Sequence, residues 1–302
     1  MFANKAHVKH IGLNAPDLYI ATTANLLALD VSSGEEVWKI SGAARSVFVS
    51  PDNFLYVGTT SVKKINPMTQ SVVWQTSSLG GGCYVSVSNN GMVFVSVTID
   101  TGDTPGKICR LNPHDGSVIW SVTNIGQGCI GSAVDPDGYF YCGNYDGVVS
   151  KRDPSDGSAD WSEDIGSRAY NISFGNDYLY VCSTIYIKKV EPADGSVEWT
   201  SAGFGGFSNA YPCVSPSKVY GGGSGGRVYE ILDSDGTTVR QSTDWGSNAV
   251  LASDDSGVIY AGWSDGSIRK LSSTLSEVWV NTDYGDAVKC MATNYYSGWE
   301  GS

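Results

Sequence analysis

The sequence has no long apolar run and no helical patterning. No stretch of about 18 apolar residues occurs, so no segment is long enough to cross a membrane as a helix. No window of about a dozen residues places apolar residues at the spacing of an amphipathic helix. Residues Met1 to His7 lack the apolar centre of a signal peptide, and we therefore expect synthesis in the cytoplasm.

Positive charge is scarce. The 19 Lys and Arg residues face 31 Asp and Glu residues, and the formal net charge is −12. This balance argues against nucleic acid or an anionic membrane surface as a partner. The three histidines, His7, His10 and His114, are scattered, and their spacing suggests no Ser-His-Asp or Cys-His arrangement. We expect no catalytic residues.

Cysteine pairing is also missing. The 7 cysteines are odd in number and contain no C-x-x-C pair, which argues against a disulfide framework or a zinc site. Most of them fall in apolar or aromatic strand segments, where buried free thiols are expected. These residues are Cys83, Cys129, Cys142, Cys182, Cys213 and Cys290.

What the sequence does contain is a repeat. Residues Leu27 to Ile40 read as a strand ending at Asp30, a tight turn closed by Gly34, and a second strand that carries Trp38. The same pattern returns with the tryptophan again four residues after the glycine. The recurring pairs are Gly116 and Trp120, Gly157 and Trp161, and Gly195 and Trp199. A repeat of this kind decides the fold before any motif does.

Each repeat accommodates four strands in roughly 40 residues, which is the size of a propeller blade. An aromatic residue marks the second strand of each unit. These residues are Tyr19, Tyr56, Phe94, Tyr141, Tyr180, Tyr220 and Tyr260. The sequence therefore predicts one all-β domain over residues 1–302, a propeller of seven four-stranded blades, with eight blades as the alternative.

The repeats run from about residue 7 to residue 282, and residues 283–302 remain outside them. Ala287 to Thr293 reads as one more innermost strand. This tail either closes the ring in place of Val8 to Asn14, packs outside the ring as a docking segment, or begins an incomplete eighth blade. We favour seven blades closed by the chain termini.

The repeat resembles the PQQ-type repeat of quinoprotein-like propellers, whose pattern is roughly Ala-x-Asp-x-x-Thr/Ser-Gly-x-x-x-Trp. The residues that match it are Ala28, Asp30, Ser33, Gly34 and Trp38. Units three to five match more loosely, and unit six has Arg240 in the tryptophan position. The resemblance implies tryptophans that pack between blades. It implies a fold and transfers no catalytic residue.

Two activities of that family are expected to be absent. Quinoprotein dehydrogenases hold a quinone and a calcium ion on the axis, often beside a disulfide of adjacent cysteines, and this sequence has no adjacent cysteines and no spare acidic cluster. Outer-membrane assembly lipoproteins share the repeat but need a secretion signal and a lipidated cysteine, neither of which we identify here. We therefore expect no cofactor.

Acidic turns suggest calcium only superficially. Asp135 and Asp137, like Asp233 and Asp235, precede a glycine in short turns. Calcium needs about six to eight oxygen ligands, and these turns offer no long spaced loop. Asp bonds its own backbone in such turns and Gly accepts a positive φ, so we predict no metal site.

The mouth of the central channel is the better candidate site. Loops that lead from the fourth strand of one blade into the next innermost strand contain glycine and carry polar residues. The candidate ligand-binding residues are His10, Arg45, Arg168, Asn209 and Asn248. Such donors suit a small anion, a sugar or a partner's carboxylate, although the simpler explanation is that they only solvate the channel mouth and satisfy carbonyls there.

Three tryptophans fall outside the repeat position: Trp245, Trp263 and Trp299. As surface aromatics they would stack on sugars or anchor a protein contact, and packing within a propeller face is the alternative.

These observations predict a non-catalytic interaction or structural module whose partners are other protein chains of an assembly. A propeller that stands alone between Met1 and Ser302 suits a phage or virus virion, as a decoration, tail or receptor-binding protein. The alternatives are a glycan- or receptor-binding propeller and, further away, a quinone-dependent dehydrogenase.

Overall fold

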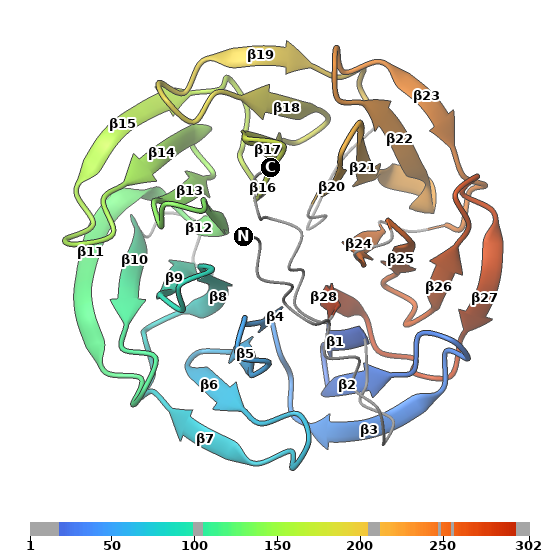
Figure 1. Cartoon of the computed structure of the whole chain (residues 1–302), viewed down its shortest axis with the longest axis horizontal. Helices are drawn as coiled ribbons and strands as arrows, with labels where there is room; N and C mark the ends of the chain where they lie inside the picture. The colour runs from blue at the N-terminus through green and yellow to red at the C-terminus, as the bar shows by residue number, and fades with distance from the viewer. Residues whose placement is uncertain (1–17, 99–104, 205–211, 247–248, 255–256, 294–302) are drawn as a thin grey trace, which may run out of the picture.

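The computed structural model describes residues 18–98, 105–204, 212–246, 249–254 and 257–293, and these residues form a ring of seven four-stranded antiparallel sheets (Figure 1). The predicted all-β propeller with seven blades is therefore confirmed, and no eighth sheet occurs within these ranges. Six of the seven sheets are meanders, in which the four strands follow one another along the chain.

The strands of each blade are given from the innermost to the outermost. Blade one contains β28 (Val288–Thr293), β1 (Leu18–Thr22), β2 (Asn25–Leu29) and β3 (Glu36–Ser41). Blade two contains β4 (Ser46–Val49), β5 (Leu55–Gly58), β6 (Val62–Ile65) and β7 (Val72–Gln75). Blade three contains β8 (Gly82–Val87), β9 (Val93–Thr98), β10 (Pro105–Leu111) and β11 (Val118–Gln127). Blade four contains β12 (Cys129–Val134), β13 (Phe140–Asn144), β14 (Val148–Arg152) and β15 (Ala159–Asp164).

The remaining blades follow the same order. Blade five contains β16 (Asn171–Gly175), β17 (Tyr178–Cys182), β18 (Ile187–Val190) and β19 (Val197–Thr200). Blade six contains β20 (Cys213–Ser215), β21 (Lys218–Gly222), β22 (Val228–Leu232) and β23 (Thr238–Gln241), with the short 3-10 turn η1 (Ser224–Gly226) between β21 and β22. Blade seven contains β24 (Val250–Ser253), β25 (Ile259–Gly262), β26 (Ile268–Leu271) and β27 (Glu277–Asn281). No helix in the described ranges is long and apolar enough to cross a membrane.

The ring is closed by pairing the two ends of the described chain. β28 runs antiparallel to β1, with Leu18 opposite Thr293 and Ile20 opposite Met291. The C-terminal strand is thus the innermost strand of blade one, and the ring-closing role proposed for the tail holds for residues 288–293. The competing segment Val8 to Asn14 lies outside the described residues.

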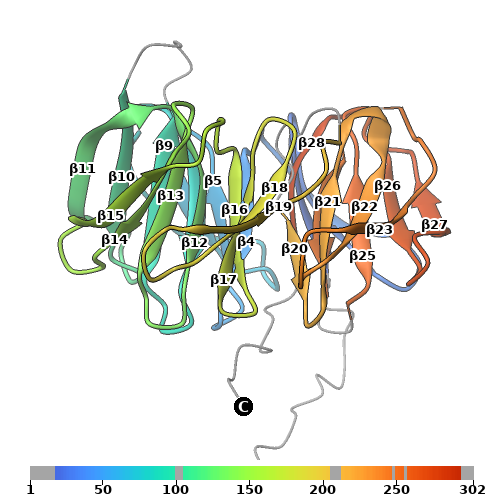
Figure 2. The same cartoon turned by 90° about the horizontal axis from the view of Figure 1, so that it is seen from above.

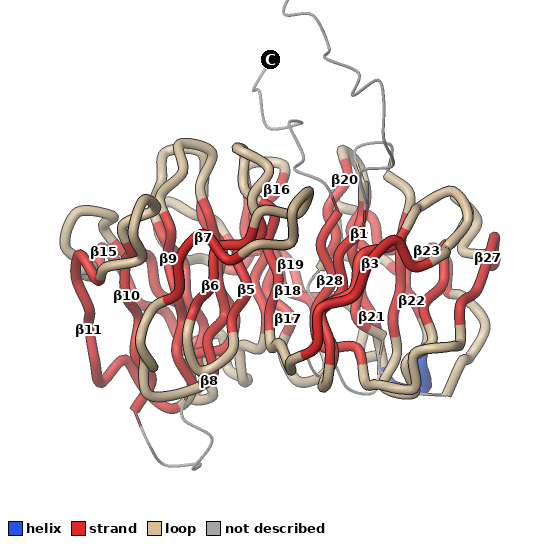
Figure 3. The backbone as a smooth tube through the Cα atoms, turned by 90° about the horizontal axis from the view of Figure 1, so that it is seen from below, coloured by secondary structure: helices blue, strands red, loops and turns tan. Residues whose placement is uncertain are grey.

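The antiparallel order gives the ring two different faces, seen edge-on in Figures 2 and 3. One face carries the turns between first and second strands and between third and fourth strands, and we call it the turn face. The other carries the connections between second and third strands and the loops between blades, and we call it the loop face. Thr293 ends the first strand of blade one and Leu18 begins the second. Both therefore lie on the turn face.

Each blade buries a row of side chains that crosses its strands. In blade two, Tyr56 lies opposite Lys64, and Lys64 lies opposite Trp74. The Tyr56 and Trp74 rings approach edge to face with centroids 5.7 Å apart, and the Lys64 ammonium lies 5.3 Å from the centre of the Tyr56 ring. The alternation of strand side chains places these residues on one face, where the aromatic rings cover the lysine stem.

The repeat tryptophans join neighbouring blades, as the family resemblance implies. The indole Nε1 of one blade donates to a backbone carbonyl in the outer turn of the next blade. The pairs are Trp74 to Pro113 at 3.0 Å, Trp120 to Pro154 at 2.9 Å, Trp161 to Pro192 at 3.0 Å, Trp199 to Asp233 at 2.8 Å and Trp279 to Val31 at 3.2 Å. Arg240 replaces the tryptophan in blade six and donates to Ser273 O at 2.7 Å.

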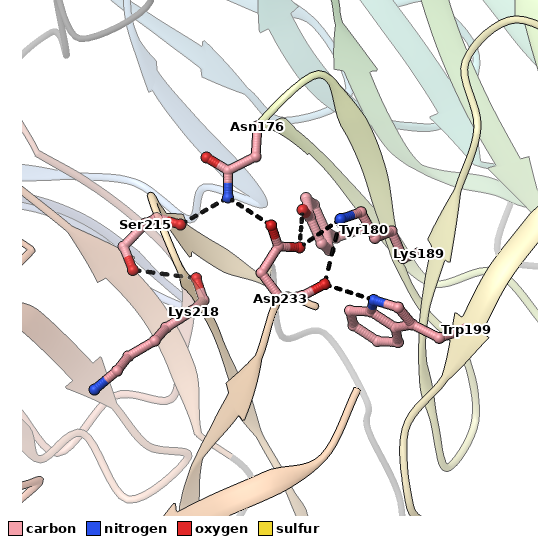
Figure 4. A network of polar contacts seen from close by, with 7 residues as sticks. All are labelled: Asn176, Tyr180, Lys189, Trp199, Ser215, Lys218 and Asp233. Atoms are coloured by element: carbon pink, nitrogen blue, oxygen red, sulfur yellow. Dashed lines mark hydrogen bonds and ion pairs between the residues drawn. The ribbon is translucent and has the colours of Figure 1, made fainter. Parts of the chain in front are cut away.

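A polar network adds to this junction between blades five and six (Figure 4). The Asp233 carboxylate accepts hydrogen bonds from the Tyr180 hydroxyl and, at 3.2 Å, from Asn176 Nδ2. Lys189 Nζ lies 2.8 Å from the same carboxylate. Asn176 Nδ2 also donates to Ser215 O at 2.7 Å, so blade five holds the innermost turn of blade six as well. Every partner comes from a different strand or turn, which couples the two sheets.

All seven cysteines are buried and free, as the sequence predicts. Most occupy strand positions inside the apolar clusters between blades, where they pack as small apolar side chains. Burial raises the pKa of Cys83 and Cys213 to about 12 and that of Cys109 and Cys290 to about 11. A raised pKa keeps these thiols protonated at neutral pH.

Candidate functional site

The loop that carries Arg168 is fixed between blades four and five. Gly166 N donates to the Asp164 carboxylate at 2.7 Å, Ala169 N donates to Asn144 O at 3.0 Å, and Tyr170 N donates to Cys182 O at 2.8 Å. The glycine has a φ of 76°, which lets the chain turn sharply on the loop face before β16 begins. The loop therefore presents Arg168 on a rigid support.

Arg168 is exposed and stands over an aromatic surface. Its guanidinium carbon lies 5.3 Å from the centre of the Tyr145 ring, and Tyr145 contacts Tyr170 edge to face at 6.0 Å. Both tyrosines are half-buried, so part of each ring faces solvent. No carboxylate of the described chain forms an ion pair with Arg168. We call these three residues the Arg168 patch, and a rigid guanidinium on tyrosine rings is a typical anchor of protein contacts.

The other predicted channel-mouth residues do not join this patch. Arg45 is half-buried and packs over the start of β8, where a Cβ added to Gly82 would stand 2.6 Å from its side chain. Arg45 precedes blade two and Arg168 precedes blade five, so the structure does not bring them onto neighbouring blades. His10, Asn209 and Asn248 lie outside the described residues.

The prediction that Trp263 is a surface aromatic is wrong. Its side chain is fully buried in the cluster between blades six and seven, and its Nε1 donates to Gly226 O at 3.1 Å. Trp245 is half-buried, contacts Trp263 edge to face at 5.2 Å, and has the Arg269 guanidinium 5.2 Å from its ring centre. Trp245 thus covers Trp263 and keeps part of its own surface open. Trp299 lies outside the described residues.

The acidic turns serve the backbone, in line with the turn chemistry predicted for them. Asp235 Oδ1 accepts from Thr237 N at 2.9 Å, and Asp135 accepts from Tyr139 N at 2.9 Å and from the Tyr141 hydroxyl at 2.9 Å. Burial raises the pKa of Asp135, and burial next to that carboxyl raises the pKa of Tyr141. In the part of the chain that the structure describes, no three His, Cys, Asp or Glu side chains gather at one point that a metal ion would occupy.

The residues on the propeller axis do not fit a quinone with a calcium ion. A cavity lies on the axis, and Asp135 is the one carboxylate among the described residues that line it. Both oxygens of that carboxylate already accept hydrogen bonds, so they are poor ligands for calcium. No Lys or Arg of the described chain lines the cavity to hold an anionic cofactor.

Comparisons with known proteins agree with the repeat. A family model described as outer membrane protein assembly factor BamB matches residues 22–180, more than half of the chain, and the chain belongs to this family of PQQ-type repeat propellers. The crystal structure of BamB from Moraxella catarrhalis superposes with a TM-score of 0.61 at 16% identity, covering 91% of this chain and 85% of the other. At that identity the likeness shows the fold alone. No curated protein sequence matches this one.

Sequence reasoning missed Tyr145 and Tyr170. Tyr170 stands two residues after Arg168, so the loop itself carried a signal that was not used. Tyr145 follows the second strand of blade four, and its contact with the Arg168 loop crosses from one blade to the next. A contact between blades depends on the radial arrangement of sheets, and no spacing along the chain reports it.

Proposed function

We propose that the protein is a non-catalytic interaction module that docks a partner polypeptide on its loop face through the Arg168 patch. The observation that carries this proposal is the exposed Arg168 guanidinium, held over Tyr145 and without a carboxylate partner in the described chain. Arginine and tyrosine on a rigid support are the residue types that dominate binding energy at protein interfaces. An interaction of this kind requires no catalytic groups.

The family supports a role in assembly. The description of the matching family names an assembly factor, and the similar solved structure is a BamB protein. Those words apply to the relatives, and we extend to this chain only the general idea of a propeller that binds other protein chains. Repeat folds of this type supply broad rigid surfaces on which loops carry the specificity.

The test is native mass spectrometry of the protein purified from its natural source with its partners. We expect release of a complex with at least one further chain, and we expect Arg168→Ala and Tyr170→Ala to weaken that complex by about tenfold or more. His114→Ala is the matched control, because His114 is exposed on the turn face. Retention of the partner by both loop-face variants, or its loss in the control, would overturn the proposal.

We further propose that the protein is made in the cytoplasm and functions inside a larger assembly, of which a phage or virus virion is one example. The free state of all seven cysteines supports a reducing compartment. Mass spectrometry of purified particles from the natural source tests the virion context. A chain found only in the soluble fraction, with none in particles, contradicts it.

A glycan- or receptor-binding function is the second candidate, and it rests on Trp245. This ring is half-buried, and the preceding residue, Asp244, forms an ion pair with Arg227 at 3.6 Å, so one segment carries a stacking surface and hydrogen-bonding groups. Binding of a panel of immobilised sugars should then fall with Trp245→Ala and stay unchanged with Arg168→Ala. Sugar binding that is unchanged in Trp245→Ala would contradict this function.

A further inference from the structure

The propeller axis contains a cavity of about 310 Å³ that no part of the proposed function uses. Six of the seven innermost strands line it, namely β4, β8, β12, β16, β24 and β28. It extends along the axis to Asn89 and Pro136, which belong to turns on the turn face. Arg45 and Arg168 are not among its lining residues, so this cavity and the Arg168 patch are separate features.

The wall of the cavity is mainly apolar. Phe48 and Phe174 line it from blades two and five, and both are only half-buried although they belong to innermost strands. Since each of them also packs against a buried cluster between its own blade and a neighbouring blade, the surface that stays accessible faces the cavity. Ala292 from β28 is exposed to the cavity in the same way. An apolar surface of this kind favours apolar guests over water.

The hydroxyl groups in the wall are largely used to bridge neighbouring blades. Ser86 and Ser132 bond each other at 2.8 Å, and Thr293 Oγ1 donates to Ser253 O at 2.6 Å. Ser173 is half-buried, lines the cavity, and makes no side-chain hydrogen bond within the described ranges, whereas the Ser253 hydroxyl, also in the wall, faces the Cys213 thiol. The wall therefore offers a guest one free hydroxyl and few sites that would hold ordered water.

The cavity also lacks a free charge. Asp135 is 7% exposed, and its two oxygens accept from Tyr139 N and the Tyr141 hydroxyl. No Lys, Arg or His of the described chain lines the space. An ion placed here would lose its hydration without gaining a counter-ion, which is strongly unfavourable. A neutral guest carries no such cost.

From these contacts we infer that the axial cavity is a binding site for an uncharged, mainly apolar small molecule that offers one hydrogen-bonding group to Ser173. An open channel on the axis is common to propellers, and an apolar guest that fills this one makes contacts that its lining residues otherwise lack. The cavity reaches the turns of the turn face, whereas the proposed partner docking takes place on the opposite face.

The experiment compares two fluorescent probes that differ by one charge. N-phenyl-1-naphthylamine is neutral, and 8-anilino-1-naphthalenesulfonate has nearly the same rings with a sulfonate added. We expect one equivalent of the neutral probe to bind the full chain, and we expect the sulfonated probe to bind about tenfold more weakly or less. Equal or tighter binding of the sulfonated probe would overturn the inference, and this comparison needs no variant.

Two variants then place the probe. Ser173→Phe and Ala292→Phe each add a ring on a different wall of the cavity, and each should weaken the neutral probe by about tenfold or more. Ser162→Phe is the control, because Ser162 is exposed on the outermost strand of blade four. If one cavity variant does not fold, the other still tests whether the probe binds in the cavity. Unchanged affinity in the folded cavity variants, or an equal loss in the control, would show that the probe binds elsewhere and refute the site.

Discussion

Trp74 of blade two lies directly on Gly116 of blade three. A Cβ added at Gly116 would stand 2.6 Å from Cε3 of the indole, closer than real Cβ contacts come, and the φ of this glycine is 74°. The same contact recurs at four more junctions around the ring, between Gly157 and Trp120, Gly195 and Trp161, Gly236 and Trp199, and Gly34 and Trp279. The glycine and the tryptophan recur together in the repeat because each of these tryptophans packs on the glycine of the following blade.

Substituting this glycine should destabilise the protein by more than the strain of its backbone conformation alone. We predict that Gly116→Ala lowers the free energy of unfolding by about 2–4 kcal/mol, from the strained φ together with the overlap with Trp74. Gly91→Ala is the matched control, because Gly91 has a φ of 82° and no atom within 4 Å of the added Cβ. Its loss should be about 1 kcal/mol. Urea denaturation measures both, and equal losses would argue against the indole contact.

The junction between blades one and two departs from this rule. Trp38 Nε1 is buried without an acceptor, and the turn of blade two has Gln70 at a φ of 59° where five of the other blades have glycine. We predict that Gln70→Gly raises the free energy of unfolding by about 0.5–1 kcal/mol, because glycine adopts this φ without strain.

Leu275 of blade seven has nearly the same φ, 60°, but its side chain is 3% exposed in an apolar cluster. Leu275→Gly should therefore destabilise the protein by about 2–4 kcal/mol, because the lost burial outweighs the relief of strain. Thermal and urea denaturation of the two variants should shift in opposite directions. A shift of the same sign in both would refute this account.

The polar junction in Figure 4 predicts that replacing one carboxylate oxygen changes the stability of the protein strongly. Asp233→Asn removes the charge that faces Lys189, whose side chain is 11% exposed, and should lower the free energy of unfolding by about 3 kcal/mol. Asp235→Asn is the control in the same turn, since Asp235 is exposed and only accepts from Thr237 N, which an asparagine also does. Similar losses in the two variants would assign the effect to the turn and not to the ion pair.

Alkaline pH should weaken the fold. Burial raises the pKa of Cys83 to about 12 and of Cys290 to about 11, above the ordinary 9.0 that the unfolded chain keeps. Between those values the unfolded state binds fewer protons than the folded state. The stability that these thiols contribute is therefore fully present below about pH 9 and is lost as pH rises through the folded pKa. Each such thiol contributes a slope of at most about 1.4 kcal/mol per pH unit.

Urea denaturation at several pH values between about 8 and 11 measures this slope. Cys290→Ala should make it shallower by about one proton. Val47→Ala shortens a side chain in the same buried cluster without removing a titrating group, and it should lower stability equally at every pH. A slope that is unchanged in Cys290→Ala would show that this thiol does not contribute.

Much of the architecture can be predicted from the sequence. The spacing of Gly34 and Trp38, and its return along the chain, predicts strand, turn and strand in every unit, because only a tight turn with a positive φ places the two strands in register. The apolar surroundings of the cysteines predict their burial. Residue periodicity decides these features locally, which is why the four-stranded unit and the buried free cysteines follow from the sequence, whereas the sequence leaves seven and eight blades open.

Other features required the folded ring. Two segments, Val8 to Asn14 and Ala287 to Thr293, read equally well as the innermost strand of blade one, and only the long-range pairing of Leu18 with Thr293 shows that the second takes that place. Trp263 falls outside the repeat position, and its burial follows from how blades six and seven pack. The sequence by itself thus determined the repeated unit. The tertiary structure decided ring closure, the Arg168 patch and the axial cavity, because each depends on contacts between different sheets.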